Sequence, residues 1–215
     1  MQIFSMFRRS AANLKSVQCL AVTGVLSALY IVLNAYVGLN ITSPLGPLRI
    51  TFGYLALAMI AMLYGPVVAV LAAIPCDLLA ATLDPHNAMN PVFTPNRMLE
   101  GLIYGIMLYG LLRKDYRGSI LNMVGFVLRI AMARLVVMFV CYIVLNNFLI
   151  FNFSLPPGRP QEILSNGTFW AWAWARNGWK NLIQFPADLA LMYIMLPSAG
   201  LAYIKTVGKH RRKEA

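Results

Sequence analysis

The sequence predicts an all-α, polytopic membrane protein: a bundle of six transmembrane helices that forms a single domain over residues 1–215. Two observations predict this class. Hydrophobic residues make up 60% of the chain and charged residues only 12%, about half the charged share of an ordinary soluble protein. The apolar residues also gather in long runs, and at roughly 20 residues per crossing the length accommodates about six helices. The lipid bilayer is therefore the expected solvent.

Apolar runs separated by turn signals define the six helices. In chain order they cover residues 17–38, 50–64, 67–83, 97–112, 119–153 and 181–203. The first run is longer than the core of a cleaved signal peptide and is expected to remain as a span, ended by a polar, turn-rich loop at 40–47. The second run is short for a crossing, and Gly65-Pro66 turns it directly into the third. Three prolines between Asp84 and Asn96 predict an ordered loop, because proline cannot continue a helix.

The second half of the chain holds two long apolar segments joined by an aromatic connection. Segment 119–153 is longer than one crossing needs, so residues 130–153 are expected to form its membrane part. The stretch 154–180 is the longest predicted connection, and the last span, 181–203, leads into a basic tail. Four tryptophans fall within ten residues of the connection: Trp170, Trp172, Trp174 and Trp179.

The distribution of basic residues predicts the orientation in the membrane. Six crossings place both termini on one side, and that side holds eleven of the 18 Lys and Arg residues, against five on the other and two within a span. Because cytoplasmic segments carry the excess of positive charge, both termini are predicted to be cytoplasmic in a multi-pass protein of the cell membrane. The same topology explains the net charge of +11, so nucleic acid is not an expected partner. The three long loops then face outward, as a capture protein requires.

Ionisable residues inside predicted spans are candidate site residues, because a charged side chain there costs roughly 2.5–3.5 kcal/mol on insertion scales. Asp77 lies about 10 Å below the outer end of the third span at 1.5 Å per residue. Arg97 and Glu100 are three residues apart, share a helix face and could satisfy each other. The residues that raise the same question are Asp188, Arg129 and Arg134. For the two arginines of the fifth span, a structural ion pair or snorkelling is the favoured interpretation.

The tryptophan cluster and the small residues of the first span each allow two interpretations. The tryptophans stand beside Arg176 and Lys180, and flat rings with fixed cations suit a planar anionic ligand. An interfacial aromatic belt is the alternative. Gly24 and Ala28 form a small-xxx-small pair that lets another helix approach closely, for which packing within the chain is the ordinary explanation.

The chain lacks the motifs of several function classes. It has no GxxxxGK[ST] phosphate loop, no HExxH and no GxSxG, and its three cysteines have no metal-ligand spacing. We therefore predict no catalytic residue, no metal site and no cofactor, and do not expect an enzyme. No duplication of two like halves is visible, which disfavours a self-sufficient secondary transporter.

Six motifs, in order along residues 17–197, resemble the substrate-binding S components of energy-coupling factor (ECF) vitamin transporters, and most of all the folate family. They are Leu48-Arg-Ile-Thr-Phe-Gly-Tyr54, Leu63-Tyr-Gly-Pro66, Asp77-Leu-Leu, Gly101-Leu-Ile-Tyr-Gly105, Leu145-Asn-Asn147 and Lys180-Asn-Leu-Ile-Gln-Phe-Pro186. The resemblance implies a membrane-embedded subunit that captures folate or a folate-like vitamin outside the cell. Uptake would be driven by ATP through partners, namely a transmembrane coupling subunit and two cytoplasmic ATPase subunits. It also implies that small residues of the first helix contact the coupling subunit: Ala21, Gly24, Val25 and Ala28.

Together with the residue chemistry, the resemblance predicts a ligand site under the outer loops. Its candidate residues are Asp77, Arg97, Glu100, Arg49, Asn146, Trp172, Trp174, Arg176, Asn181 and Gln184. The carboxylates would accept hydrogen bonds from an amino-pyrimidine edge and the arginines would pair with ligand carboxylates. The tryptophans would stack on the ring, and the amides would add polar contacts.

The sequence departs from the family pattern at one position of the predicted site. An arginine is expected directly before the Gly101 to Gly105 motif, where this chain has Glu100, and an arginine stands one turn earlier as Arg97. The ligand could therefore be another heteroaromatic vitamin or precursor, such as a queuosine precursor, thiamine or riboflavin. A membrane enzyme or a structural assembly subunit is the alternative from another class.

Overall fold

The computed structural model describes residues 2–43, 46–83, 91–111, 120–155, 158–165 and 167–211. In chain order, the elements are α1 (Gln2–Asn13), α2 (Val17–Ala35), β1 (Leu39–Ser43), β2 (Gly46–Ile50), α3 (Gly53–Tyr64), α4 (Pro66–Leu83), the 3-10 turn η1 (Pro91–Phe93), α5 (Thr94–Leu108), α6 (Ile120–Val137), the π-helical η3 (Met138–Leu145), α7 (Asn146–Leu149), the π-helical η4 (Ile150–Ser154), α8 (Arg159–Ser165), α9 (Phe169–Ala173), the π-helical η5 (Trp174–Gly178) and α10 (Trp179–Arg211). The predicted helical, apolar fold class is confirmed in its main feature.

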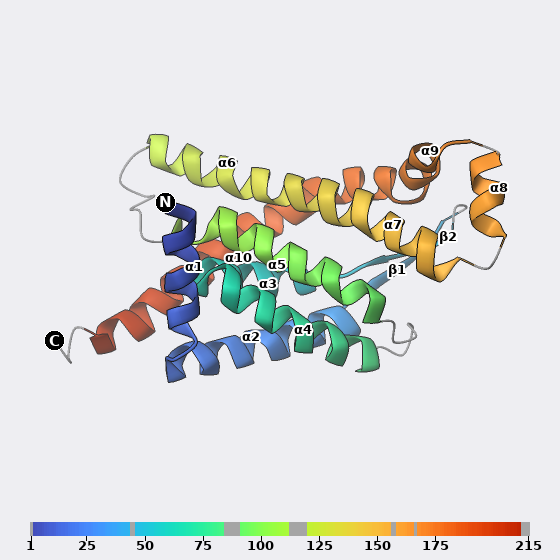
Figure 1. Ribbon diagram of the computed structural model, residues 1–215. Helices are drawn as coiled ribbons and strands as arrows, with labels where there is room; N and C mark the ends of the chain where they lie inside the picture. Colours follow the sequence, from blue (N-terminus) through green and yellow to red (C-terminus); the bar gives the residue numbers. More distant parts are fainter. Residues whose placement is uncertain are drawn as a thin grey trace.

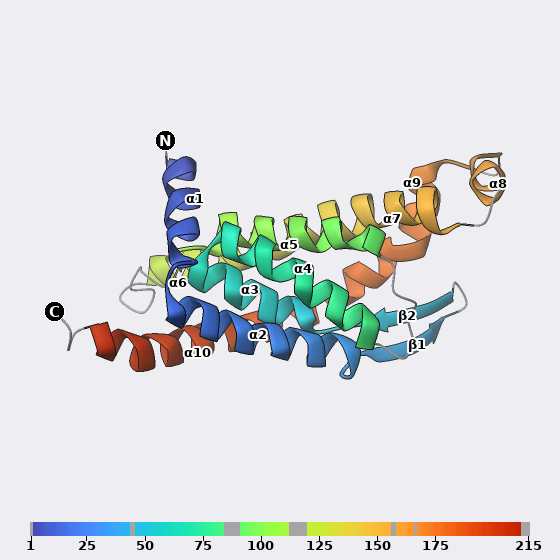
Figure 2. The same cartoon turned by 60° about the horizontal axis from the view of Figure 1, so that its bottom comes forward.

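The long helices run along a common axis and form an elongated bundle (Figure 1). Both chain termini lie at one end of it, and the β1–β2 hairpin and α8 lie at the other (Figure 2). The helix α1 crosses the end that carries the termini, transverse to the rest. The bundle therefore has two distinct ends, and the polar cavity described below lies toward the end with the hairpin.

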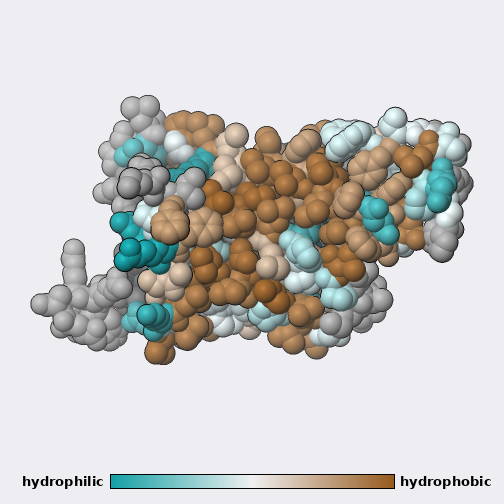
Figure 3. Space-filling view, in the orientation of Figure 1, coloured by the Kyte–Doolittle hydropathy of each residue, from teal (hydrophilic) through white to brown (hydrophobic). Residues whose placement is uncertain are grey.

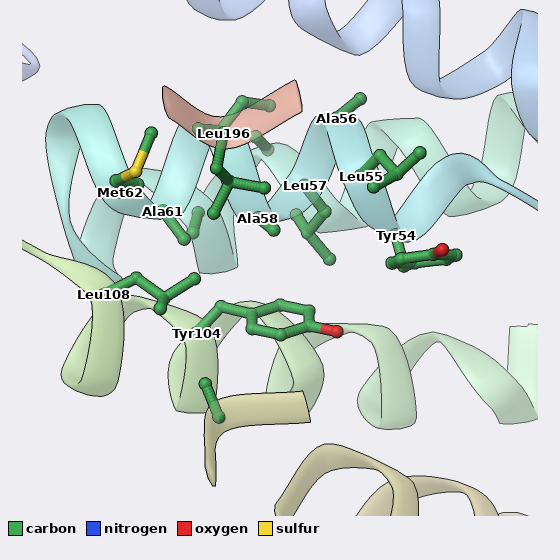
Figure 4. Close-up of a cluster of buried hydrophobic side chains, with 14 of the residues drawn as sticks. Tyr54, Leu55, Ala56, Leu57, Ala58, Ala61, Met62, Tyr104, Leu108 and Leu196 are labelled. Atoms are coloured by element: carbon green, nitrogen blue, oxygen red, sulfur yellow. The ribbon is translucent and has the colours of Figure 1, made fainter. Parts of the chain in front are cut away.

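The core of the bundle is α3, which contacts α2, α4, α5 and α10. Its residues from Gly53 to Met62 are all buried, because the segment is apolar on every side and carries no polar stripe to face water. Figure 4 shows α3 side chains between Tyr104 of α5 and Leu196 of α10. At 12 residues the helix is about 18 Å long, well short of the roughly 30 Å apolar core of a bilayer.

The helices α4 and α5 pack closely because glycines of α5 face the backbone of α4. A Cβ on Gly101 would stand 3.1 Å from the carbonyl oxygen of Ala69, and one on Gly105 would overlap the backbone of Pro66. This glycine pair therefore packs within the chain. The turn before α4 also needs a glycine, since Gly65 has φ +93°.

Several predicted boundaries differ from the structure. The first helix ends at Ala35 instead of residue 38, and α5 begins at Thr94, inside the predicted loop 84–96. Pro95 lies in the first turn of α5, where its missing N–H loses no helical hydrogen bond. Residues 84–90 lie outside the described part of the chain. The last helix is longer than predicted, because the basic tail continues it to Arg211.

The predicted connection 154–180 is the largest error of the sequence interpretation. The segment holds α8, α9 and η5, and η5 leads directly into α10. Thr168 caps α9 by accepting a hydrogen bond from the backbone N–H of Ala171 at 3.3 Å. The polar and aromatic composition suggested a loop, but four closely spaced tryptophans and alanines fit a helix at the membrane interface equally well.

A β-hairpin replaces part of the predicted loop after the first helix and is, within the described residues, a local exception to the predicted all-α class. β1 and β2 pair antiparallel, with Leu39 opposite Ile50 and Asn40 opposite Arg49. The chain leaves α2 at Ala35 and enters α3 at Gly53, and the hairpin satisfies the backbone hydrogen bonds of the segment between them.

The transverse helix α1 is held on the turn between α3 and α4. The hydroxyl of Ser10 donates to the carbonyl of Tyr64 at 2.8 Å and accepts from the backbone N–H of Val67 at 3.0 Å. Asn13 donates to the same carbonyl at 3.1 Å. The basic N-terminal segment is therefore an ordered helix that caps one end of the bundle.

Within the described residues, four helical segments are long and apolar enough to cross a membrane. They are Val17–Ala35, Pro66–Leu83, Asn122–Ser154 and Phe169–Tyr203. Figure 3 shows hydrophobic residues over the middle of the bundle and hydrophilic ones toward its ends. The protein is thus a membrane protein with several apolar helices, while the predicted count of six crossings exceeds the four segments that meet the length criterion.

Candidate functional site

A polar cavity of about 130 Å³ opens between the helices toward the end with the hairpin. Its described lining residues are Thr51, Asn96, Arg97, Arg134, Tyr142, Asn146, Asn177, Lys180, Asn181 and Gln184. They come from the segment after β2, the start of α5, the long helix α6–η4, and the η5–α10 segment. All ten have polar side chains, although the surrounding bundle is apolar. Such a lining in a membrane protein indicates a polar ligand.

Arg97 links two acidic side chains on the α5 side of the cavity. Its Nη1 donates to Oε2 of Glu100 at 2.9 Å, and its Nε lies 3.6 Å from Oδ1 of Asp77. Thr94 donates to the other oxygen of Asp77 at 2.9 Å. The side chain of Arg97 is 25% exposed and that of Glu100 only 1%. The predicted pairing of Arg97 with Glu100 is therefore present.

Arg134 is the centre of a second ion-pair group under the cavity. Its Nη2 and Nε donate to Oδ2 of Asp188, the latter at 3.1 Å, and its Nη1 donates to the hydroxyl of Tyr104 at 2.9 Å. Oε1 of Glu100 lies 3.9 Å from the same Nη1. The guanidinium also lies over the ring of Tyr54, 4.1 Å from its centroid. A buried charge needs such partners, because desolvation without them is very costly.

The two groups share Glu100, so a continuous chain of charges crosses the site. Tyr142 reinforces the junction by donating to Oε1 of Glu100 at 2.8 Å. At the far end, Asp188 also accepts hydrogen bonds from Tyr54 at 2.7 Å and from Gln184 at 3.2 Å. In this row of charges, the guanidinium groups of Arg97 and Arg134 are matched by three carboxylates, those of Asp77, Glu100 and Asp188. This part of the site is suited to a neutral ligand group that forms hydrogen bonds.

Amide side chains form the wall opposite α5. Asn147 is fully buried and joins two π-helical segments: it donates to the carbonyl of Ile143 at 2.8 Å and accepts from Asn177 at 2.7 Å. A further contact runs from its Nδ2 to the carbonyl of Ala173 at 3.3 Å. This contact network places the neighbouring Asn146 and Asn177 at the cavity. π-helical turns of this kind are frequent at functional sites.

The aromatic cluster lies beside the cavity and outside its lining. The ring centroid of Trp172 lies 5.8 Å from that of Phe151 and 6.0 Å from that of Phe169. The guanidinium of Arg176 lies 5.7 Å from the centroid of Trp172. Trp174 is 52% exposed. The cluster therefore presents aromatic surface and a cation next to the cavity mouth.

Comparison with known proteins identifies the family. The model of the family "ECF transporter, substrate-specific component" matches residues 18–196. The chain belongs to this family. A curated relative, the folate transporter FolT of Clostridium novyi (strain NT), is 34% identical over 71 residues, which cover 33% of this chain and 40% of the relative. The aligned part of the chain thus spans two fifths of that relative's length.

A solved structure shares the fold of this S component. The crystal structure of FolT bound with folic acid superposes with a TM-score of 0.62 and 24% identity, covering 85% of this chain and 95% of that one. Membership places the chain among substrate-binding components of membrane transporters, a class distinct from enzymes.

The structure brings some of the predicted site residues of the S component together. Four of them line the cavity: Arg97, Asn146, Asn181 and Gln184. Asp77 and Glu100 contact Arg97, and Trp172 and Arg176 belong to the adjacent aromatic cluster. Trp174 is 52% exposed and does not line the cavity. The side chain of Arg49 lies outside the described part of the chain.

Sequence reasoning missed six lining residues. They are Thr51, Asn96, Arg134, Tyr142, Asn177 and Lys180. Arg134 had been interpreted as a structural ion pair, which it forms, but it also borders the cavity. Lys180 and Asn177 adjoin the tryptophan cluster, so the density of polar residues there was an available signal. No feature of the neighbouring sequence marks Asn96 or Tyr142 as a lining residue.

Proposed function

We propose that this S component is the substrate-binding subunit of an ECF-type ABC transporter and captures folate or a folate-like vitamin outside the cell. The observation that carries the proposal is the polar, amide-rich cavity within an apolar bundle of this family. The names of the FolT relative and of the folic-acid-bound structure support folate as the ligand.

The charges of the site suggest how such a ligand is oriented. Because Arg97 and Arg134 are already paired with carboxylates, the cavity favours the neutral heteroaromatic end of the vitamin. The amides of Asn146, Asn181 and Gln184 supply its hydrogen bonds. The ligand's negatively charged tail then extends toward the aromatic cluster, where Arg176 pairs with a carboxylate and Trp172 stacks.

The small residues of α2 are the proposed contact with the coupling subunit. Ala21, Gly24, Val25 and Ala28 are all exposed, and a Cβ on Gly24 would meet nothing within 4 Å. Packing within the chain therefore does not account for this strip. A flat, small-residue surface allows a partner helix to approach closely, and two cytoplasmic ATPase subunits would complete the transporter.

The orientation follows from the excess of basic residues at the end that carries the termini. With both termini in the cytoplasm, the cavity, the hairpin and α8 face outward, and the vitamin enters from outside. The chain has no phosphate-binding loop of its own, so ATP-driven release inward depends on the partners.

Titration of the purified protein with folic acid, followed by tryptophan fluorescence or calorimetry, tests the proposal. We expect saturable, tight binding, with mass spectrometry detecting a folate in protein purified without added ligand. Asp77→Asn and Arg97→Ala should both weaken binding, because each breaks the ion-pair group that borders the cavity. Binding of thiamine, riboflavin or a queuosine precursor in place of folic acid would refute the choice of ligand.

A further inference from the structure

Asn96 stands out among the cavity residues because its buried side-chain oxygen has no partner. The residue is buried, with 4% of its surface exposed, and it lines the cavity. Its Oδ1 forms no hydrogen bond with any described residue, and it is the one buried side-chain polar atom of the described chain in that condition. The adjacent Arg97 and the nearby Thr94 instead bond to carboxylates.

An unpaired buried amide lowers the stability of the ligand-free protein. A buried acceptor that loses water without gaining a partner carries its full desolvation cost, whereas an apolar residue of similar shape carries none. The contrast with Asn147 is direct: that residue is also fully buried, but it makes three hydrogen bonds. A polar group held without partners at a cavity is therefore expected to find its partner in the ligand.

We propose that Asn96 is a specificity-determining residue whose carboxamide pairs with an edge of the ligand ring carrying an N–H donor beside an acceptor. An asparagine amide offers an acceptor oxygen next to a donating NH₂ group, so it matches a cyclic amide or an amino-imine edge. Such edges belong to planar nitrogen heterocycles. The inference rests on the proposed function for the site and names the chemical feature of the ligand that the site recognises.

Two leucine substitutions in the full-length protein test this role. Asn96→Leu removes the amide and keeps a similar volume, while Asn147→Leu does the same at the buried asparagine that has partners. The measurements are the Tm of the ligand-free protein and the Kd for folic acid. For Asn96→Leu we expect a Tm equal to or above that of the unmodified protein, with an affinity roughly 10- to 100-fold lower. For Asn147→Leu we expect a lower Tm.

The sign of the Tm change in Asn96→Leu distinguishes a role in ligand recognition from a structural role. A fall in Tm for Asn96→Leu comparable with that of Asn147→Leu, or an unchanged Kd, would overturn the proposal. Thiamine, riboflavin and a queuosine precursor are titrated in parallel. If one of them binds in place of folic acid and Asn96→Leu weakens it, the folate assignment fails while the role of Asn96 holds. If none of the four binds the unmodified protein, both proposals fail.

Discussion

The buried ion pair between Arg134 and Asp188 is the most sensitive contact of the molecule at the scale of single residues. The two side chains are each 3% exposed and lie on different helices, α6 and α10. The net contribution of the pair to the free energy of unfolding is limited by the cost of desolvating both charges. Either charge left alone in this environment is strongly unfavourable. The pair therefore holds α6 and α10 in one arrangement around the cavity.

Replacing one member of the pair should be far more damaging than replacing both. Arg134→Met leaves Asp188 unpaired, and we expect a loss of about 3–5 kcal/mol in the free energy of unfolding. The double variant with Asp188→Leu should recover part of that loss. Thermal unfolding in detergent, without ligand, measures both.

Arg129 provides the matched control on the same helix. It makes no ion pair with any described residue, and Arg129→Met should change the unfolding temperature little. Equal losses for Arg129→Met and Arg134→Met would contradict the special role of the buried pair.

At the scale of elements, the contact of α4 with α5 depends on the absence of a side chain. Gly105→Ala places a Cβ against the backbone of Pro66, and backbone cannot move aside as a flexible side chain can. We expect a loss of about 1–3 kcal/mol, as for other overpacked cores. Denaturation of the purified protein measures the effect.

Gly24 is the control for this substitution, since a Cβ there meets nothing. Gly24→Ala should leave stability unchanged or raise it, because alanine favours a helix by about 1 kcal/mol over glycine. A similar loss of stability in both variants would contradict the role of the α4–α5 contact, because helix propensity alone favours alanine at both positions.

At the scale of the whole molecule, the exposed strip of α2 and the cavity are separate surfaces. Gly24→Trp should therefore leave folic acid affinity unchanged and abolish assembly with the proposed coupling and ATPase subunits. Leu128→Trp on α6, a position that is 58% exposed, serves as control and should permit assembly. Co-purification of the tagged complex measures assembly, and retained assembly of Gly24→Trp would remove α2 from the interface.

The orientation of the molecule is testable with single introduced cysteines. The three native cysteines are at most 1% exposed, so they give little background. Gly167→Cys should react with a membrane-impermeant maleimide in intact cells, and Ala11→Cys only after permeabilisation. The reverse pattern would place the termini outside.

The sequence by itself determined the features that depend on local composition. Apolar runs identified the helices and the membrane, because burial of each run in lipid needs no knowledge of its neighbours. The contact between Arg97 and Glu100 followed from their spacing on one helix.

Only the tertiary structure decided which distant residues meet. Arg134 and Asp188 are 54 positions apart, and Asn177 reaches Asn147 across two helices, so no periodicity predicts either contact. The cavity and the unpaired amide of Asn96 exist only where four segments converge. Local patterns specify how each segment folds and which of its faces is apolar, but the crossing of helices determines which polar groups share a buried space.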